Sequence, residues 1–300
     1  MSIQSALTLG PARGRGRGDV PADAGPVETG AAERSDEDRR VVRRRLGPGR
    51  RLRGAFWIGP ALLLAAWSLG SVTGLISPAI LTAPWDVLAA GRTQWTEHDL
   101  LDDITASLRR SGLGLALGVA AGTVLAIASG LSRTGESLID GPIQIKRSIP
   151  TLALIPLFIA WFGIGEEMKI VTIGLISMIP IYVNTHNALR SIDGKYAELA
   201  ETLDVSRARF IRHVVLPGAL PGFLLGLRFA VTSALLGLVV VEQYNATNGV
   251  GHMMALAENY GQTDVIVVGL VLYGVFGFLA DTGVRLVERK VLGWRRTLEG

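Results

Sequence analysis

The side chains that most often do chemistry in proteins are sparse in this chain. There is no cysteine, which excludes disulfides and thiolate metal sites. The four histidines, His98, His186, His213 and His252, are scattered, and no two have the spacing of metal ligands. The sequence also lacks a G-x-x-x-x-G-K-[ST] phosphate loop, so any ATP chemistry requires another chain. We therefore predict no catalytic residue, no metal and no cofactor on this chain.

The composition indicates a membrane protein. Of the 300 residues, 49% are hydrophobic and only 19% are charged, whereas soluble proteins are about 25% charged. The pI near 9.7 would also suit a nucleic-acid-binding protein. In a membrane chain, however, an excess of arginine usually marks cytoplasmic segments. We therefore expect contact with membrane lipid and no nucleic-acid partner.

Six apolar stretches predict an all-α integral membrane protein with about six transmembrane helices. They cover residues 56–76, 104–131, 149–164, 170–183, 223–241 and 265–286. The first has 21 residues without a charge, enough to cross about 30 Å of hydrocarbon at 1.5 Å per residue. Prolines interrupt the third and fourth stretches. One re-entrant hairpin over 149–183 is therefore the alternative, and it lowers the number of spans to four. Residues 132–147 are interpreted as a short loop, and residues 242–264 as a final loop.

Basic residues predict the orientation. With the N-terminus in the cytoplasm, the cytoplasmic pieces hold 25 Arg and Lys and the outer pieces hold only Arg92 and Lys169. Both termini are then cytoplasmic. The predicted parts are a disordered basic tail over 1–54, a transmembrane domain over 55–294 and a C-terminal tail over 295–300. Arg109, Arg110 and Arg228 lie within predicted helices, where each must face protein or snorkel. We expect the first two to snorkel toward the outer headgroups.

The second span carries Gly114, Gly118 and Gly122 at intervals of four residues. This spacing places the three glycines on one stripe of a helix, where a second helix can approach closely. The stripe therefore predicts helix packing, either within one subunit or between two subunits.

A charged stretch, YAELAETLDVSRARFIRHVVLPGALPG at 196–222, interrupts the apolar pattern. Its first part, over 195–203, predicts an amphipathic helix because Leu199, Ala200 and Leu203 share one face. The segment is expected to be soluble although apolar runs flank it on both sides.

The rest of this stretch predicts a second short helix. Asp204 and Ser206 interrupt the pattern, and either could cap the helix that follows. Apolar residues then oppose basic ones: Phe210, Ile211, Val214 and Val215 against Arg207, Arg209 and Arg212. Pro217 and Pro221 are expected to end the unit before the fifth span. The whole stretch thus predicts a cytoplasmic helix–turn–helix.

This stretch resembles the EAA loop of permease subunits of binding-protein-dependent ABC importers. The consensus of that loop is Glu-Ala-Ala, three residues, Gly, nine residues, Ile, one residue, Leu-Pro. The matching residues are Glu198, Ala200, Leu216 and Pro217. Leu199 replaces the middle Ala, Val214 replaces the Ile, and Asp204 stands where the family has Gly. Because Asp tolerates a left-handed backbone better than most residues, we expect the turn to be kept.

The resemblance extends over roughly residues 56–295. Blocks such as PTLALIPLFIAWFGIGEEMKI and VVLPGALPGFLLGLRFAV are similar to permeases of the sulfonate, taurine and nitrate importer group, and most similar to the aliphatic sulfonate branch. This implies a type I ABC importer in the bacterial inner (plasma) membrane. It has two copies of this subunit, two cytoplasmic ATPase subunits that bind ATP and Mg, and an external substrate-binding protein. The implied substrate is an aliphatic sulfonate, with taurine, nitrate or another small anion as alternatives.

In such an importer the helix–turn–helix would dock into a groove on the ATPase. The residues expected to couple the two chains are Glu198, Leu199, Ala200, Leu203, Asp204, Arg207, Arg209, Phe210, Leu216 and Pro217. Closure of the ATPases would then move the attached spans between inward-open and outward-open states.

Polar residues in or beside the spans are the candidates for the substrate pathway. They are Ser177, Asn184, Ser233, Glu242, Gln243 and Asn245. Helix packing or a position at the membrane interface is the alternative for each. Because a carboxylate is a poor ligand for an anion, we predict a gating or structural role for Glu242.

Two other classes of membrane protein fit less well. A membrane enzyme needs clustered ionisable groups at membrane depth, and the sequence shows no His or carboxylate pair there. An ion-coupled secondary transporter needs coupling-ion carboxylates in its spans and inverted repeats, and neither is visible in the sequence. Its transport would also persist without an ATPase.

Overall fold

The computed structural model describes residues 55–293, and every regular element among them is a helix. The predicted all-α class is therefore confirmed. Both predicted tails, 1–54 and 295–300, lie outside the described residues. The elements are α1 (Ala55–Val72), α2 (Pro84–Glu97), α3 (Leu100–Gly130), α4 (Arg133–Ser148), η1 (Thr151–Leu154), α5 (Ile155–Phe162), α6 (Glu166–Arg190), α7 (Gly194–Thr202), α8 (Arg207–Phe210), η2 (Ile211–Val215), α9 (Leu216–Asn245), α10 (Val250–Asn259) and α11 (Thr263–Val291).

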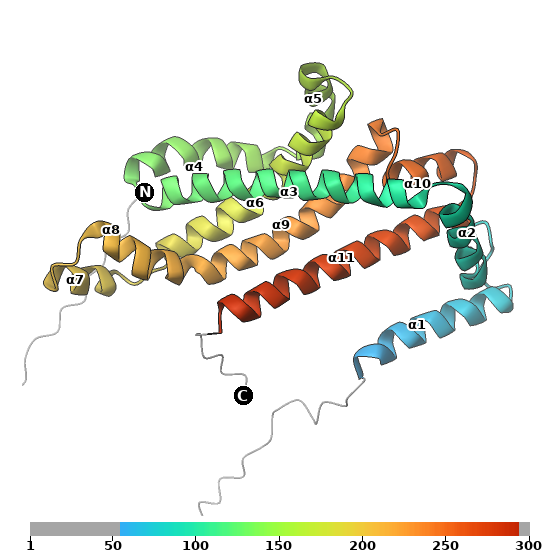
Figure 1. Ribbon diagram of the computed structural model, residues 1–300, viewed down its shortest axis with the longest axis horizontal. Coiled ribbons are helices and arrows are strands. Elements are labelled where there is room, and N and C mark those ends of the chain that lie inside the picture. Colours follow the sequence, from blue (N-terminus) through green and yellow to red (C-terminus); the bar gives the residue numbers. More distant parts are fainter. Residues whose placement is uncertain (1–54, 294–300) are drawn as a thin grey trace, which may run out of the picture. The chain divides into compact units, whose positions relative to one another are not determined.

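Four long helices, α3, α6, α9 and α11, form the main body of the described fold. As Figure 1 shows, α3 packs on α6, α6 packs on α9, and α9 packs on α11. The short helices α7 and α8 lie at one end of these helices, and α2 and α10 lie at the opposite end (Figure 1). The predicted coupling stretch and the α9–α10 connection are thus far apart but joined by α9.

The glycine stripe of α3 forms its seam with α6. A Cβ atom added at Gly114, Gly118 or Gly122 would lie 2.6, 2.2 or 2.7 Å from an atom of α6, which is closer than real Cβ contacts allow. The stripe therefore serves close packing within this subunit. Of the two interpretations left open by the sequence, the structure supports the first.

Residues 132–147 form the helix α4, so the predicted loop is wrong. The Ser132 side-chain oxygen caps this helix by accepting a hydrogen bond from the Gly135 N–H at 2.8 Å. Ile143 and, partly, Ile139 are buried on one side of α4, and Arg133 and Arg147 are exposed. Lys146 of α4 instead reaches α6, where it donates to the Leu175 carbonyl at 2.7 Å. Hydropathy alone does not reveal such an amphipathic helix, because its mean polarity is that of a loop.

The predicted third span is not one straight helix. α4 and the following η1–α5 segment meet at 89° on either side of Pro150. α5 has 8 residues and is only about 12 Å long, too short to cross a membrane alone. Residues 149–164 therefore belong to a bent pair of helices, which is a broken span or a re-entrant loop.

Within residues 55–293, four helices are long and apolar enough to cross a membrane: Leu100–Gly130, Glu166–Arg190, Arg207–Tyr244 and Thr263–Val291. The bent pair makes a fifth if it is one span, and α1 is a shorter apolar helix. In the described part of the chain, helices overlap all six predicted stretches, but four of them, or five with the bent pair, are long and apolar enough to be spans, fewer than the predicted six. The fourth and fifth are longer than predicted, because the helices continue past the apolar residues that hydropathy detects.

Pro217 and Pro221 do not end the coupling unit, contrary to the prediction from the sequence. α8, the π-helical turn η2 and α9 continue as one helix over Arg207–Tyr244. In η2 the Leu216 N–H bonds to the Ile211 carbonyl, five residues back. Pro217 follows directly in the first turn of α9, where this wider turn accommodates a residue without an N–H.

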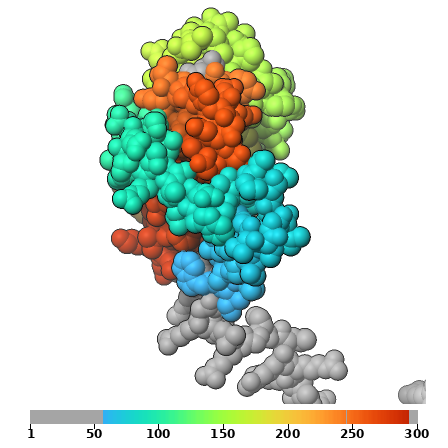
Figure 2. Space-filling view, turned by 90° about the vertical axis from the view of Figure 1, so that its right-hand side faces the viewer, coloured from blue at the N-terminus to red at the C-terminus, as the bar shows by residue number. Residues whose placement is uncertain are grey.

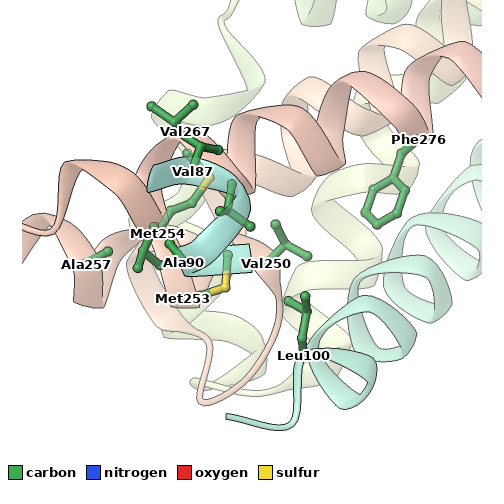
Figure 3. Close-up of a cluster of buried hydrophobic side chains, with 11 residues drawn as sticks. Val87, Ala90, Leu100, Val250, Met253, Met254, Ala257, Val267 and Phe276 are labelled. Atoms are coloured by element: carbon green, nitrogen blue, oxygen red, sulfur yellow. The ribbon is translucent and has the colours of Figure 1, made fainter. Parts of the chain in front are cut away.

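Residues 242–264, predicted as the final loop, contain the helix α10. Apolar side chains of α10 pack against neighbouring helices. Figure 3 shows Val87 and Ala90 of α2 beside Met253 and Met254 of α10, and all four are buried. Figure 2 shows this end of the helices, with α10 in orange beside the blue-green surface of α2 and the start of α3. The α9–α10 connection is thus part of a packed structure.

Candidate functional site

The predicted amphipathic helix over 195–203 is found as α7. Its N-cap Asp193 accepts a hydrogen bond from the Lys195 N–H at 3.0 Å. Leu199 and Leu203 are 54% and 66% exposed, Ala200 is half-buried, and Glu198 is exposed. α7 therefore presents the predicted apolar face to the outside of the subunit.

Asp204 forms the turn that the family builds with Gly. Its φ angle is +50°, in the left-handed region, as expected from the sequence. The Asp204 N–H bonds to the Glu201 carbonyl at 3.1 Å and the Val205 N–H bonds to the Ala200 carbonyl at 2.9 Å. This pair of bonds is a Schellman motif, which satisfies the last carbonyls of α7. Ser206 is at the N-cap of α8 but makes no capping bond through its side chain.

The second half of the coupling stretch faces inward. Phe210, Ile211 and Val215 pack in an apolar cluster with residues of α3 and α6. Arg207 donates a hydrogen bond from Nη2 to the Leu131 carbonyl at the end of α3, at 3.0 Å. This half therefore anchors α7 to the long helices. The other predicted coupling residues here, Arg209, Leu216 and Pro217, are exposed or half-buried.

The opposite end of the long helices holds a buried polar cluster. Arg110 of α3 is 2% exposed and Glu242 of α9 is 0% exposed. Arg110 Nη1 donates to Glu242 Oε1 at 2.7 Å, while Nε and Nη2 form a bidentate pair with Glu166 of α6 at 2.7 and 2.8 Å. Lys169 Nζ donates to Glu166 Oε1 at 2.8 Å. Two buried cations thus face the buried Glu242 carboxylate and the Glu166 carboxylate, whose side chain is 53% exposed, and these pairs compensate the burial of the charges.

The same cluster caps the N-terminus of α10. The first N–H groups of a helix have no partner within it, so they need outside acceptors. The acceptors come from α3 and α9: Gly249 N–H bonds to Asp103 Oδ1 at 2.6 Å, Val250 N–H to Ser107 Oγ at 2.9 Å, and Gly251 N–H to Glu242 Oε2 at 2.9 Å. Figure 1 shows the elements involved, α3, α9 and α10, meeting at this end.

The turn before α10 fits closely around Arg110. Arg110 Nη1 donates to the Asn248 carbonyl at 2.7 Å, and Nη2 also bonds to the Asn248 side-chain oxygen. Gly249 has a φ angle of +114°, which other residues rarely adopt. A Cβ atom there would lie 2.5 Å from Glu242 Oε1 and 2.7 Å from Arg110 Nη1. Only glycine therefore fits at this position.

Glu242 is the centre of these contacts. Its two oxygens accept from the Ser107 hydroxyl at 2.9 and 2.8 Å, and Oε2 also accepts from the Tyr273 hydroxyl of α11 at 3.1 Å. We call these residues the Arg110 cluster: Asp103, Ser107, Arg110, Glu166, Lys169, Glu242, Asn248 and Tyr273. It joins α3, α6, α9 and α11 to the N-terminus of α10.

Two predictions are corrected by the Arg110 cluster. Arg110 does not snorkel toward headgroups, because its guanidinium is enclosed by Glu166, Glu242 and Asn248. Lys169, counted as an outer-loop residue, is 3% exposed and bonded to Glu166. The sequence did contain a signal for this pair. Arg110 does not fit the positive-inside distribution, so it needs a carboxylate partner, and Glu242 at the end of an apolar stretch is a candidate.

The other pathway candidates are distributed along α6 and α9, and Gln243 and Asn245 follow Glu242 at the end of α9. Ser177 is fully buried at the α3–α6 seam, and its hydroxyl donates to the Ile173 carbonyl of its own helix at 2.8 Å. Asn184 is half-buried and donates to the Pro180 carbonyl at 2.8 Å. Ser233 is half-buried on α9 and Gln243 is exposed. Asn245 ends α9, and its side chain is outside the described set.

Comparison with known proteins decides what kind of molecule this is. Residues 115–293 match the family described as the inner membrane component of binding-protein-dependent transport systems. The chain belongs to this family. It is therefore a permease, the membrane subunit of an ABC importer, and not an enzyme. The ATPase and the substrate-binding protein of such a system are separate chains, and the permease resides in the inner membrane.

Curated relatives cover most of the permease. It is 41% identical over 81% of its length to the putative aliphatic sulfonates transport permease protein SsuC of Escherichia coli, of which the match covers 92%. It is 37% identical over 84% of its length to the protein of the same name in Bacillus subtilis, also with 92% of that protein covered. The taurine transport system permease protein TauC of Escherichia coli is 35% identical over 78% of this permease and 87% of TauC.

A solved structure shows the same fold. The crystal structure of an amino acid ABC transporter with histidines superposes with a TM-score of 0.54, covering 63% of this permease and 92% of that chain. The sequence identity is 17%, so the likeness concerns the fold alone. The predicted type I importer architecture is thereby confirmed.

Proposed function

We propose that this permease carries an aliphatic sulfonate that a binding protein delivers. The observation that carries the proposal is the 41% identity to the aliphatic sulfonates permease of Escherichia coli, which exceeds the 35% identity to the taurine permease of the same organism. Taurine is the second candidate, since it is also a small organic sulfonate. Nitrate or another small anion of this importer group is a more distant alternative.

We propose further that α7 docks on the ATPase. Its exposed leucines, Leu199 and Leu203, support this, because burying them against a partner would remove apolar surface from water. The ATPase supplies ATP and Mg binding, and this chain binds neither. The 25-to-2 distribution of basic residues supports an orientation with α7 and both termini in the cytoplasm. Two copies of the permease, surrounded by lipid, form the translocation path.

ATP-driven closure of the ATPases would pull α7 and, through the turn at Asp204, the continuous helix that α8, η2 and α9 form. The anchoring of Arg207 to the end of α3 supports transmission to the long helices as well. A ligand shifts a conformational equilibrium only when it binds one state better, and ATP meets this condition if it binds best to closed ATPases.

The proposal is tested by reconstituting the permease with its ATPase and binding protein in proteoliposomes. Uptake and ATP hydrolysis are measured with an alkanesulfonate, taurine and nitrate in turn. We expect the alkanesulfonate to stimulate both most strongly, and uptake to require ATP. A larger response to taurine or nitrate would contradict the substrate assignment. Uptake without ATP would contradict the coupling to an ATPase.

A further inference from the structure

The helix that begins at the coupling loop ends in the Arg110 cluster. α8, η2 and α9 form one helix over Arg207–Tyr244, and Glu242 lies in its last turn. The helical rise from Arg207 to Glu242 is roughly 50 Å. The end that the ATPase would pull is therefore linked by one continuous helix to the carboxylate that caps α10.

Glu242 is a polar contact between α9 and the first turn of α10. Its Oε2 accepts from the Gly251 N–H at 2.9 Å, while Oε1 accepts from Arg110 at 2.7 Å. The α9–α10 connection is short, and Arg110 and Asp103 of α3 hold it at Asn248 and Gly249. A displacement of α9 thus reaches α10 through the Glu242 carboxylate, with α3 as the fixed partner.

The position of α10 makes this contact functionally relevant. α10 lies at the end of the helices opposite the coupling loop, and part of its surface is exposed, including Leu256 and Glu258 (Figures 1 and 2). In an importer with the coupling loop in the cytoplasm, this end faces the binding protein.

We propose that Glu242 and Arg110 are positioning residues that transmit conformational change between the coupling loop and α10. Binding-protein docking at one end and ATP binding at the other then act on the same helix, and linkage requires each to affect the other. The inference rests on the proposed docking of α7 on an ATPase. It assigns the cluster a role in the coupling between the two sites, in addition to its contribution to stability.

The test compares ATP hydrolysis with and without loaded binding protein, using the complete reconstituted complex. The first variant is Glu242→Gln, which keeps the shape and some hydrogen bonds but removes the charge. It is expected to assemble, because Arg110 retains its bidentate pair with Glu166. We expect the ratio of stimulated to basal hydrolysis to fall roughly 5-fold or more, the low end of typical allosteric coupling. Tyr273→Phe removes one bond to Glu242 and should shift the ratio less, in the same direction.

The matched control is Asp281→Asn. Asp281 of α11 pairs with Arg228 of α9 at 2.7 Å, so it also joins α9 to a neighbour, but away from α10 and partly exposed. Its stimulation ratio should stay within about twofold of the parent, since exposed pairs contribute little. A merely structural role of Glu242 would lower the amount of assembled complex and leave the ratio per complex unchanged.

The outcomes separate the two proposals. If the parent complex is stimulated and Glu242→Gln has the same ratio per assembled complex, the positioning role is overturned and the proposed function stands. If Glu242→Gln does not assemble, Tyr273→Phe decides in the same way. If the parent complex shows no stimulation by any loaded binding protein, the proposed function itself fails. A double variant Arg110→Gln/Glu242→Gln with the parent ratio would also overturn the positioning role.

Discussion

The regions at the two ends of the Arg207–Tyr244 helix both depart from the usual rule that apolar side chains are buried and charged side chains are exposed. At the coupling loop, the apolar residues Leu199 and Leu203 are exposed. At the Arg110 cluster, the charged residues Arg110 and Glu242 are buried. The buried charges have their partners within the subunit, whereas the exposed leucines have no apolar covering among residues 55–293. The Arg110 cluster therefore holds this subunit together, and the exposed face of α7 is the surface that we propose docks on the ATPase.

The largest effect is expected when one charge is removed from the Arg110 cluster. Arg110→Met leaves Glu242 buried without a cation, and breaking a buried pair in this way costs about 3–5 kcal/mol. The measurement is thermal unfolding of the purified permease in detergent.

Arg228→Met is the control for this prediction. Asp281 keeps a second partner, Arg285 at 2.6 Å, when Arg228 is removed, so this variant leaves no carboxylate unpaired and should lose less stability than Arg110→Met. Equal losses of stability in the two variants would show that the Arg110 cluster is not a buried, fully partnered site.

A glycine-to-alanine substitution should have opposite effects at the two ends. Gly249→Ala adds a Cβ at 2.5 Å from Glu242 Oε1 and at a left-handed φ, which should cost about 1–3 kcal/mol. Gly194→Ala, in the first turn of α7, meets no atom within 4 Å and should be neutral or stabilising by up to about 1 kcal/mol. Unfolding midpoints of the two variants test this directly, and a destabilised Gly194→Ala would contradict the open environment of α7.

The smallest effect concerns the turn after α7. Asp204→Gly should tighten the Schellman motif slightly, whereas Asp204→Val should weaken it by about 1–2 kcal/mol, the cost of a left-handed conformation. Hydrogen exchange at the Val205 N–H, which bonds to the Ala200 carbonyl, reports on this turn alone. Faster exchange in the glycine variant than in the valine variant would mean that the turn is not left-handed in solution.

The sequence predicted the local structure of α7 and the turn after it, because both depend on residues close together in the chain. Leu199 and Leu203 share a face through helical spacing, and Asp204 occupies the position of a consensus glycine four residues after Ala200. The prediction that Asp204 keeps the turn required no knowledge of distant residues, because it depends only on the left-handed backbone conformation that the turn needs.

The Arg110 cluster could not be assembled from the sequence in the same way. Arg110 is 56 residues from Glu166, 132 from Glu242 and 138 from Asn248. From the sequence alone, Arg110 had no assigned partner and was therefore predicted to reach water. Its partners come together only when α3, α6 and α9 pack. The continuity through Pro217 was missed for a related reason, since a π-helical turn is not visible in a residue pattern.

The most direct test of the comparison is the affinity of the purified ATPase subunit for permease in nanodiscs. Leu199→Glu places a charge on the exposed face of α7 and should weaken binding at least about 10-fold, the equivalent of one buried leucine side chain. Without binding protein, Glu242→Gln should bind the ATPase like the parent, because it leaves the exposed face of α7 unchanged. Parent-like binding by Leu199→Glu, or an equal loss in both variants, would contradict the division of roles between the two ends.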